Sequence, residues 1–246
     1  LLSPNIATFL PLSSTLATNI ASSFSKIGYK TALVDADIYG PSIAHLMNVD
    51  DKPVNKDGQI LPIVKDGIKF ISVANLIAKQ AAGIWRAAMI NKILNQLLLQ
   101  TNWGFDDQEV DMMVVDMPPG TGDIYLSLAQ NFAVNGALLV ATPQSLCEID
   151  LIRTIDCFRK LEVPIVGMIE NMSHYVDDNG KKVAIFGESN VANIAKSNDI
   201  EMVASLEITP KVNVDNKQIY CQQYPGDNFS HNIGMACEKI ISKLTD

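Results

Sequence analysis

The segment "VDMMVVDMPPGTGD" (110–123) decides the fold. Its apolar run ends at Asp116, and prolines and glycines separate Asp116 from Asp123. Unbroken apolar runs are typical of strands covered on both faces of a sheet. Similar runs occupy 30–35, 68–74, 136–142 and 164–171, with a weaker one at 200–206. Helical patterns alternate with them at 13–28, 87–101, 121–132, 148–161 and 232–244. This alternation predicts an α/β fold: a doubly wound, mostly parallel sheet flanked by helices.

Length and composition limit the classes of protein to consider. A chain of 246 residues with 48% apolar and 19% charged residues suits one globular domain spanning 1–246. A net charge of −8 argues against general nucleic-acid binding. Four scattered cysteines without C-x-x-C argue against a disulfide-rich secreted fold. No apolar run reaches the roughly 20 residues of a membrane span, and no signal-peptide pattern is visible. We therefore expect a protein of the cytoplasm or an organelle matrix.

Polar residues gather where the predicted strands end. Ligands of such sheets bind beyond the carboxyl ends of the strands, which places 116–123 beside 35–42, 141–145 and 170–173. Asp35, Asp37 and Asp116 stand at neighbouring strand ends, where carboxylates repel one another unless a cation or hydrogen-bond donors lie between them. A magnesium ion that bridges to phosphates is the usual solution.

Several motifs in this order carry a family resemblance. They are "DADIYGPS" (35–42), "WRAAMINK" (85–92), "VVDMPPGTGD" (114–123), "TPQS" (142–145), "ENMS" (170–173) and "IFG" (185–187). With them the chain resembles the Mrp/ApbC iron–sulfur cluster carrier ATPases of the MinD/ParA group of P-loop NTPases. The resemblance covers roughly residues 14–244.

The resemblance implies roles for four residues at a magnesium site. Asp116 corresponds to the Walker B carboxylate, and Asp37 to the carboxylate that orients the attacking water. Asp35 supports the metal shell. Ser14, at the start of the first helix, offers the hydroxyl that ligates magnesium. The expected catalytic residues are thus Asp37 and Asp116, and the expected metal residues are Ser14, Asp35 and Asp116.

The resemblance also implies an ATP site. Asn171 reads adenine, and Pro210 lies where a loop covers the base. The glycines of "PPGTG" (118–122) let the backbone approach the γ-phosphate. The expected nucleotide-binding residues are Ser14, Thr15, Pro119, Gly120, Gly122, Asn171 and Pro210.

The family further implies a homodimer, apo iron–sulfur proteins as clients, and a [4Fe–4S] cluster. Members that bridge a cluster across the dimer carry C-x-x-C shortly after the segment that matches "ENMS". The corresponding stretch is "HYVDDNGKK" (174–182), which holds no cysteine. Cluster binding therefore does not carry over to this chain.

The first residues depart from the family pattern. G-K-G-G-V-G-K should precede Ser14, but residues 7–13 read "ATFLPLS", without lysine or glycine. The loop needs glycine N–H groups and a lysine to hold phosphates, and Pro11 has no N–H. "SPNIATF" (3–9) is a short, proline-broken candidate for the strand before the loop. We therefore expect 1–13 to replace both strand and phosphate loop, and nucleotide binding and hydrolysis to be impaired.

Two further hypotheses stay open. One is a MinD/ParA-type positioning or partitioning ATPase, which would use a membrane-seeking helix or a DNA-binding patch. The apolar face of the C-terminal helix predicts that this helix docks on the sheet, which argues against a membrane-seeking helix. The other is a non-catalytic scaffold that has lost the nucleotide.

Overall fold

The computed structural model describes residues 5–9, 14–76, 87–104, 106, 109–118, 120, 123–213 and 218–245. Its main sheet has the strand order β12-β9-β8-β1-β7-β2-β6-β5, and its pairings are parallel except for that of β5 with β6. This confirms the predicted mostly parallel sheet. The strands of this sheet are β1 (Asn5–Phe9), β2 (Thr31–Asp35), β5 (Ile63–Lys65), β6 (Ile68–Ser72), β7 (Met112–Asp116), β8 (Gly136–Ala141), β9 (Ile165–Glu170) and β12 (Met202–Ser205).

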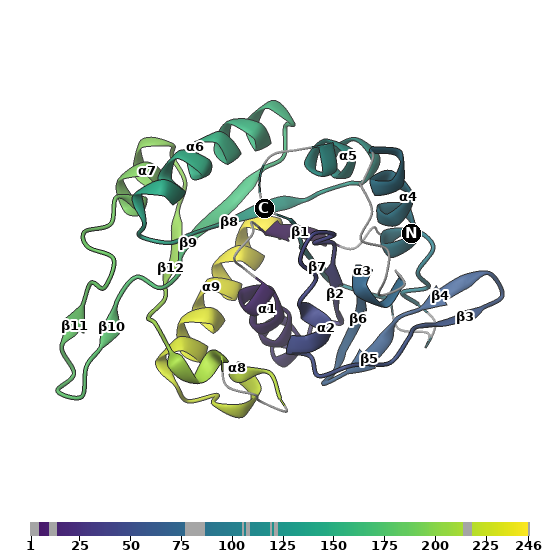
Figure 1. Cartoon of the computed structure of the whole chain (residues 1–246), viewed down its shortest axis with the longest axis horizontal. Coiled ribbons are helices and arrows are strands. Elements are labelled where there is room, and N and C mark those ends of the chain that lie inside the picture. The colour runs from purple at the N-terminus through teal and green to yellow at the C-terminus, as the bar shows by residue number, and fades with distance from the viewer. Residues whose placement is uncertain are drawn as a thin grey trace.

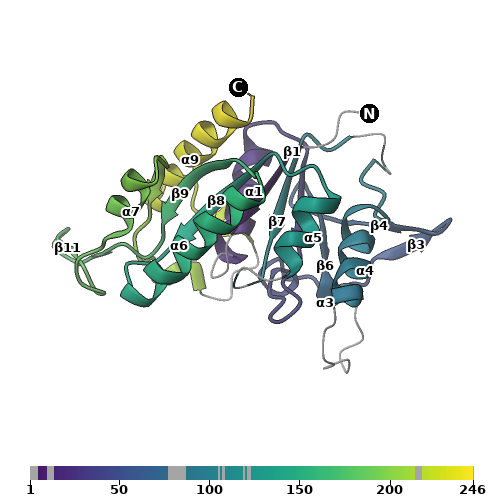
Figure 2. The same cartoon turned by 90° about the horizontal axis from the view of Figure 1, so that it is seen from above.

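Helices cover both faces of the sheet (Figure 1). They are α1 (Ser14–Lys26), α2 (Ile43–Leu46), α3 (Val73–Leu76), α4 (Ala87–Leu98), α5 (Asp123–Asn131), α6 (Ser145–Lys160), α7 (Val191–Ser197), α8 (Tyr220–Gln223) and α9 (Asn228–Thr245), with a 3-10 turn η1 at Pro210–Asn213. Seen from above, α4, α5, α6 and α7 lie on one side, and α1 and α9 on the other (Figure 2).

The apolar strands divide their side chains between two cores. In β7, Met113 and Val115 join the core under α4, α5, α6 and α7, whereas Met112 and Val114 join the core under α1 and α9. Because both faces are covered, these strands do not alternate apolar with polar residues. The buried face of α9, which includes Ile233, belongs to the second core, so the predicted docking of the terminal helix on the sheet is confirmed.

The strand β1 differs from the expectation for the first residues. Asn5–Phe9 forms a parallel strand in the middle of the sheet, between β7 and β8. The prediction that 1–13 replaces the first strand was wrong for these residues, because pairing on both sides outweighs the weak local pattern. Residues 10–13, which connect Phe9 to Ser14, lie outside the described residues.

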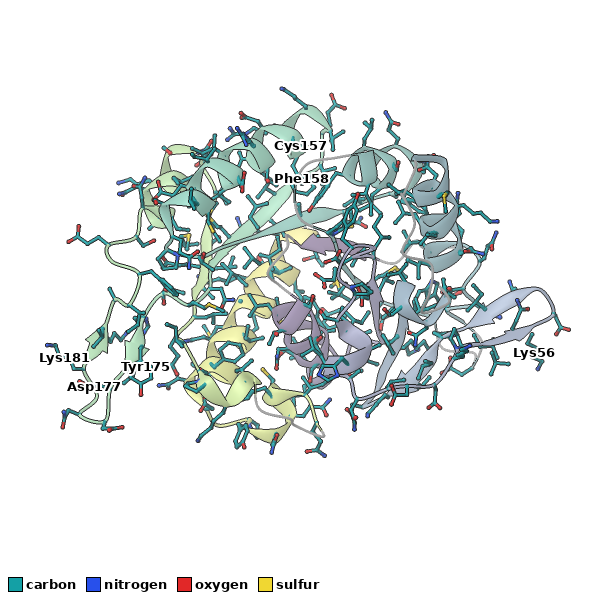
Figure 3. The ribbon with its side chains drawn as sticks, viewed as in Figure 1. Lys56, Cys157, Phe158, Tyr175, Asp177 and Lys181 are labelled. Atoms are coloured by element: carbon teal, nitrogen blue, oxygen red, sulfur yellow. The ribbon has the colours of Figure 1, made fainter. Side chains whose placement is uncertain are left out.

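Two hairpins at opposite ends of the sheet were not predicted. They are β3 (Val54–Lys56) with β4 (Gln59–Leu61), and β10 (Tyr175–Val176) with β11 (Lys182–Val183). Figure 3 shows Lys56 on the first hairpin and Asp177 near the tip of the second. Among the described helices, none is long and apolar enough to cross a membrane.

Candidate functional site

The start of α1 meets the end of β7. The Ser14 hydroxyl donates a hydrogen bond of 2.5 Å to Asp116 Oδ2. Asp116 is 1% exposed and ends a central strand, and Ser14 begins the helix that covers that strand. The predicted proximity of Ser14 and Asp116 is therefore confirmed. A hydroxyl and a carboxylate at a helix N-terminus are suited to hold a magnesium ion and the phosphates bound to it.

Asp35 lies beside Asp116, since the two are register partners in β2 and β7. Its carboxylate accepts three hydrogen bonds: from the Ser72 hydroxyl (2.8 Å), the Ile43 N–H (3.1 Å) and the Asp37 N–H (3.2 Å). Burial raises the pKa of Asp35 to about 6, although these hydrogen bonds act in the opposite direction. Both oxygens of Asp35 therefore face protein donors, which favours a role in fixing the 36–43 loop over direct contact with a metal.

Asp37 stands on that loop, half-buried. Its Oδ1 accepts the N–H groups of Tyr39 (3.0 Å) and Gly40 (3.1 Å), and its own N–H is held by Asp35. The loop is thus fixed at both ends by Asp35 and internally by Asp37. A carboxylate held in this way is suited to orient a water molecule, so the role expected for Asp37 stays a prediction that this geometry permits.

The segment after Asp116 is described in part. Pro118 is buried, and Gly120 has a φ of 99°, a left-handed conformation that favours glycine. Pro119 and Gly122 lie outside the described residues. The Pro118 carbonyl accepts a hydrogen bond of 2.9 Å from the hydroxyl of Tyr125.

Sequence reasoning missed Tyr125. Side chains in a helix lean toward its N-terminus, and Tyr125 lies in the first turn of α5, just after the loop. That position was the signal that could have identified it.

A cavity of about 100 Å³ opens beside the start of α1. Three predicted nucleotide-binding residues line it together, Thr15, Asn171 and Pro210. Asn171 Oδ1 accepts the Met172 N–H at 3.0 Å, which orients the amide and leaves its NH₂ group to donate. Lining residues that sequence reasoning did not find are Leu16, Met172, Glu207, Ile208, Thr209, Val212 and Phe229.

The walls of this cavity suit a flat ring with polar edges. Leu16, Val212 and Phe229 supply apolar surface, and Asn171 supplies an amide. Sites for small ligands combine apolar walls with a few placed polar groups in this way. The cavity and Ser14 lie at the same end of α1, which matches the base and phosphate ends of one nucleotide.

The described residues do not form an iron–sulfur site. No three of their His, Cys, Asp and Glu side chains are grouped to hold a metal ion. A [4Fe–4S] cluster takes four cysteine thiolates, whereas Cys221 and Cys237 are buried in the second core and Cys147 and Cys157 stand on α6. One protomer therefore does not fit a cluster.

The chain is similar to known proteins over most of its length. The profile of the family described as "ParA: NUBPL iron-transfer P-loop NTPase" matches residues 13–244. Proteins named iron–sulfur cluster carrier protein are 39% identical over 199 residues in Rickettsia conorii, 44% over 177 in Deinococcus radiodurans and 37% over 236 in Haemophilus influenzae. These alignments cover 81%, 71% and 94% of this chain, but 58%, 49% and 63% of the relatives. The chain thus spans about half to two thirds of their length.

Solved structures show the same fold. A nucleotide-binding protein from Archaeoglobus fulgidus in complex with ADP has a TM-score of 0.76 and 25% identity, and the match covers 92% of this chain and 90% of that one. The cell-division ATPase MinD of Pyrococcus furiosus has a TM-score of 0.68 at 16% identity, covering 98% and 99%. At that identity MinD supports the fold alone.

Proposed function

The chain belongs to the ParA/NUBPL family of iron-transfer P-loop NTPases, and on this premise we propose that it acts as an ATP-dependent iron–sulfur cluster carrier or assembly factor. The observation that carries the proposal is the Ser14–Asp116 hydrogen bond at the carboxyl edge of the sheet. In a P-loop NTPase the hydroxyl that ends the phosphate loop and the Walker B carboxylate hold magnesium together.

The residues at the carboxyl edge of the sheet would have different roles in binding and hydrolysing a magnesium nucleotide. Ser14 and Asp116 would hold the ion, which neutralises charge on the phosphates. Asp37 would orient the water that attacks the γ-phosphate, and Asp35 would keep the loop of Asp37 in place. Asp35 thereby supports the metal site from behind.

The cavity lined by Asn171 and Pro210 would bind the adenine ring. The Asn171 NH₂ group would donate to a ring nitrogen of the base, and Pro210 would cover it. The ADP complex of the Archaeoglobus relative supports a nucleotide in this fold. We expect nucleotide binding to be weak, because residues 7–13 supply neither the lysine nor the glycines of a phosphate loop.

The cluster would be cargo rather than a resident group. We propose that this chain supplies the nucleotide-driven step of transfer to apo iron–sulfur proteins, acting as a homodimer whose nucleotide crevices face one another. Light scattering at high protein concentration, with and without ATP, tests the dimer. Detection of monomer alone under both conditions would contradict it.

Magnesium-dependent ATP binding tests the proposal. Saturation experiments at millimolar ATP should give binding that requires magnesium, and Ser14→Ala should weaken it about tenfold, the loss of one charge-assisted contact. Ser242→Ala is the matched control, because Ser242 is an exposed serine on α9, outside the loops at the strand ends. Binding that ignores magnesium, or that falls equally in both variants, would exclude this site.

A further inference from the structure

We propose that Tyr125 is a positioning residue for the start of the loop after Asp116, which it holds through the Pro118 carbonyl; this inference rests on the function proposed above. The Tyr125 hydroxyl donates to that carbonyl at 2.9 Å, and the side chain is 1% exposed. The bond joins the first turn of α5 to the segment that directly follows Asp116. No resemblance or comparison assigns a role to Tyr125.

The loop needs an anchor from outside because of its own composition. Pro118 and Pro119 have no N–H groups, so neither can donate a hydrogen bond to neighbouring backbone or side chains. Their carbonyls are the backbone polar groups by which this part of the loop can be fixed. Gly120, next along the chain, has a left-handed φ of 99° that glycine adopts at little cost. Held at Pro118, the loop turns at Gly120 from a defined starting point.

Tyr125 is itself firmly placed. Its ring packs edge-on against Phe158 of α6 at a centroid distance of 5.6 Å, and Figure 3 labels Phe158 on that helix. Burial, with the nearby charges of Asp116 and Asp37, raises the pKa of Tyr125, so the phenol stays protonated and remains a donor.

The bond therefore ties the loop to Asp116. Asp116 fixes the start of the loop from the strand side, and Tyr125 fixes Pro118 from the helix side. With both ends of this short stretch held, Met117 and Pro118 are fixed between the strand β7 and the helix α5. Without the hydroxyl, the ring still packs, but the carbonyl loses its partner.

Amide hydrogen exchange of the whole chain tests this role without nucleotide. Tyr125→Phe removes one oxygen and keeps the ring on Phe158. We expect amide exchange at 117 and 120–123 to rise about three- to tenfold, the effect of one neutral hydrogen bond, while exchange in the central strands stays as in the wild type. Tyr29→Phe is the matched control, because its half-buried ring packs edge-on against Phe24, away from the loop.

The outcomes separate positioning from general stability. An increase confined to the loop in Tyr125→Phe, and absent in Tyr29→Phe, supports the proposal. Unchanged loop exchange, or an even increase across the chain, overturns it.

Turnover provides a second readout, and it separates this inference from the proposed function. In Tyr125→Phe, kcat for ATP should fall about three- to tenfold with KM unchanged; a rise in KM alone overturns the proposal. If the wild type neither binds nor hydrolyses ATP, the proposed function fails, and the exchange comparison still decides the role of Tyr125.

Discussion

Ser14 and Asp116 are 102 residues apart in sequence, yet the Ser14 hydroxyl donates to Asp116 Oδ2 at 2.5 Å. Two features bring them together: the parallel strand β7 ends in Asp116, and α1 begins at Ser14. The hydroxyl–carboxylate half of a magnesium site is therefore assembled by the fold itself. Residues 7–13, which precede Ser14, hold neither lysine nor glycine, so we expect the opposite, phosphate-holding half to be weak.

Restoring a phosphate loop should restore ATP binding. The strand β1 runs to Phe9, so residues 10–13 are shorter than the G-x-x-x-x-G-K pattern that precedes the hydroxyl. Replacing 10–13 with Gly-Lys-Gly-Gly-Val-Gly-Lys keeps β1 and supplies the glycine N–H groups and the lysine. We expect calorimetry to show affinity tighter by about a thousandfold, from two or three charge-assisted hydrogen bonds.

Two comparisons sharpen this experiment. Overwriting 7–13 with the same residues removes the end of β1 and should rescue binding less well, because Ala7, Thr8 and Phe9 pair with β7 and β8. The same insert with alanine in place of its last lysine should rescue only in part. Micromolar affinity in the unaltered chain would show that residues 7–13 do not impair the site.

In the loop-restored protein, Asp37→Asn should abolish most hydrolysis and spare binding. Asparagine keeps an oxygen that can accept the N–H groups of Tyr39 and Gly40, but it loses the charge that orients and activates water. We expect kcat to fall about 100-fold or more with little change in ATP affinity. Asp178→Asn, at the exposed hairpin tip, is the matched control. A loss of kcat no larger than in that control would remove Asp37 from the mechanism.

The buried carboxylate of Asp35 should make stability depend on pH. Its pKa rises from 3.8 unfolded to about 6 folded, through burial. Because the pKa is higher in the folded state, the contribution of Asp35 to the free energy of unfolding is fully present below the unfolded pKa. It is lost as the pH rises through about 6. Between about pH 4.5 and about pH 7.5 the loss is about 2 kcal/mol.

Asp35→Asn removes this ionisation, so the variant does not lose stability in this way as the pH rises. Relative to the wild type, the unfolding free energy of the variant should therefore rise by about 2 kcal/mol between about pH 4.5 and about pH 7.5. Urea unfolding at both pH values measures it, with Asp178→Asn as the control for a lost surface charge. A difference that stays constant with pH would show that Asp35 ionises normally.

Removing the hydroxyl of Ser72 should loosen the loop of Asp37. Ser72 is fully buried and donates to Asp35 at 2.8 Å. Ser72→Ala should cost about 1.5–3 kcal/mol, the contribution of a hydrogen bond to a charged group, and should speed amide exchange at 37–43.

Ser22→Ala offers a matched control for this experiment. Ser22 is equally buried, but its oxygen has no hydrogen-bond partner among the described residues. This variant should be neutral or stabilising. If Ser72→Ala and Ser22→Ala lower the free energy of unfolding equally, the loss in Ser72→Ala comes from packing and not from the hydrogen bond to Asp35.

The sheet could be predicted from the sequence because parallel strands bury both faces, and long apolar runs such as 110–117 carry that signal directly. The closeness of Asp35 and Asp116 followed from the rule that strand ends share one edge, and the meeting of Ser14 with Asp116 followed from the family resemblance. These features depend on local pattern and general topology.

Other features depend on pairing and side-chain reach, which local pattern does not carry. Strand β1 forms because β7 and β8 offer edges on both sides, not because "NIATF" is a strong strand sequence. The role of Asp35 as an acceptor from Ser72 and Ile43 needs the spatial course of the 36–43 loop. Tyr125 lies two residues beyond Asp123, where the segment 116–123 ends, and its reach back to Pro118 depends on the direction of its side chain.

The central place of β1 also governs how the chain can fold during synthesis. Ala7 pairs with Val114 on one side and with Gly136 on the other. The strand β1 is synthesised before both of its partner strands, so it lacks its second partner, β8, until residues near 138 have emerged, roughly 6 to 26 seconds later at 5–20 residues per second. During that interval at least one side of β1 is an unpaired edge, which chaperones can bind and where misfolding can begin.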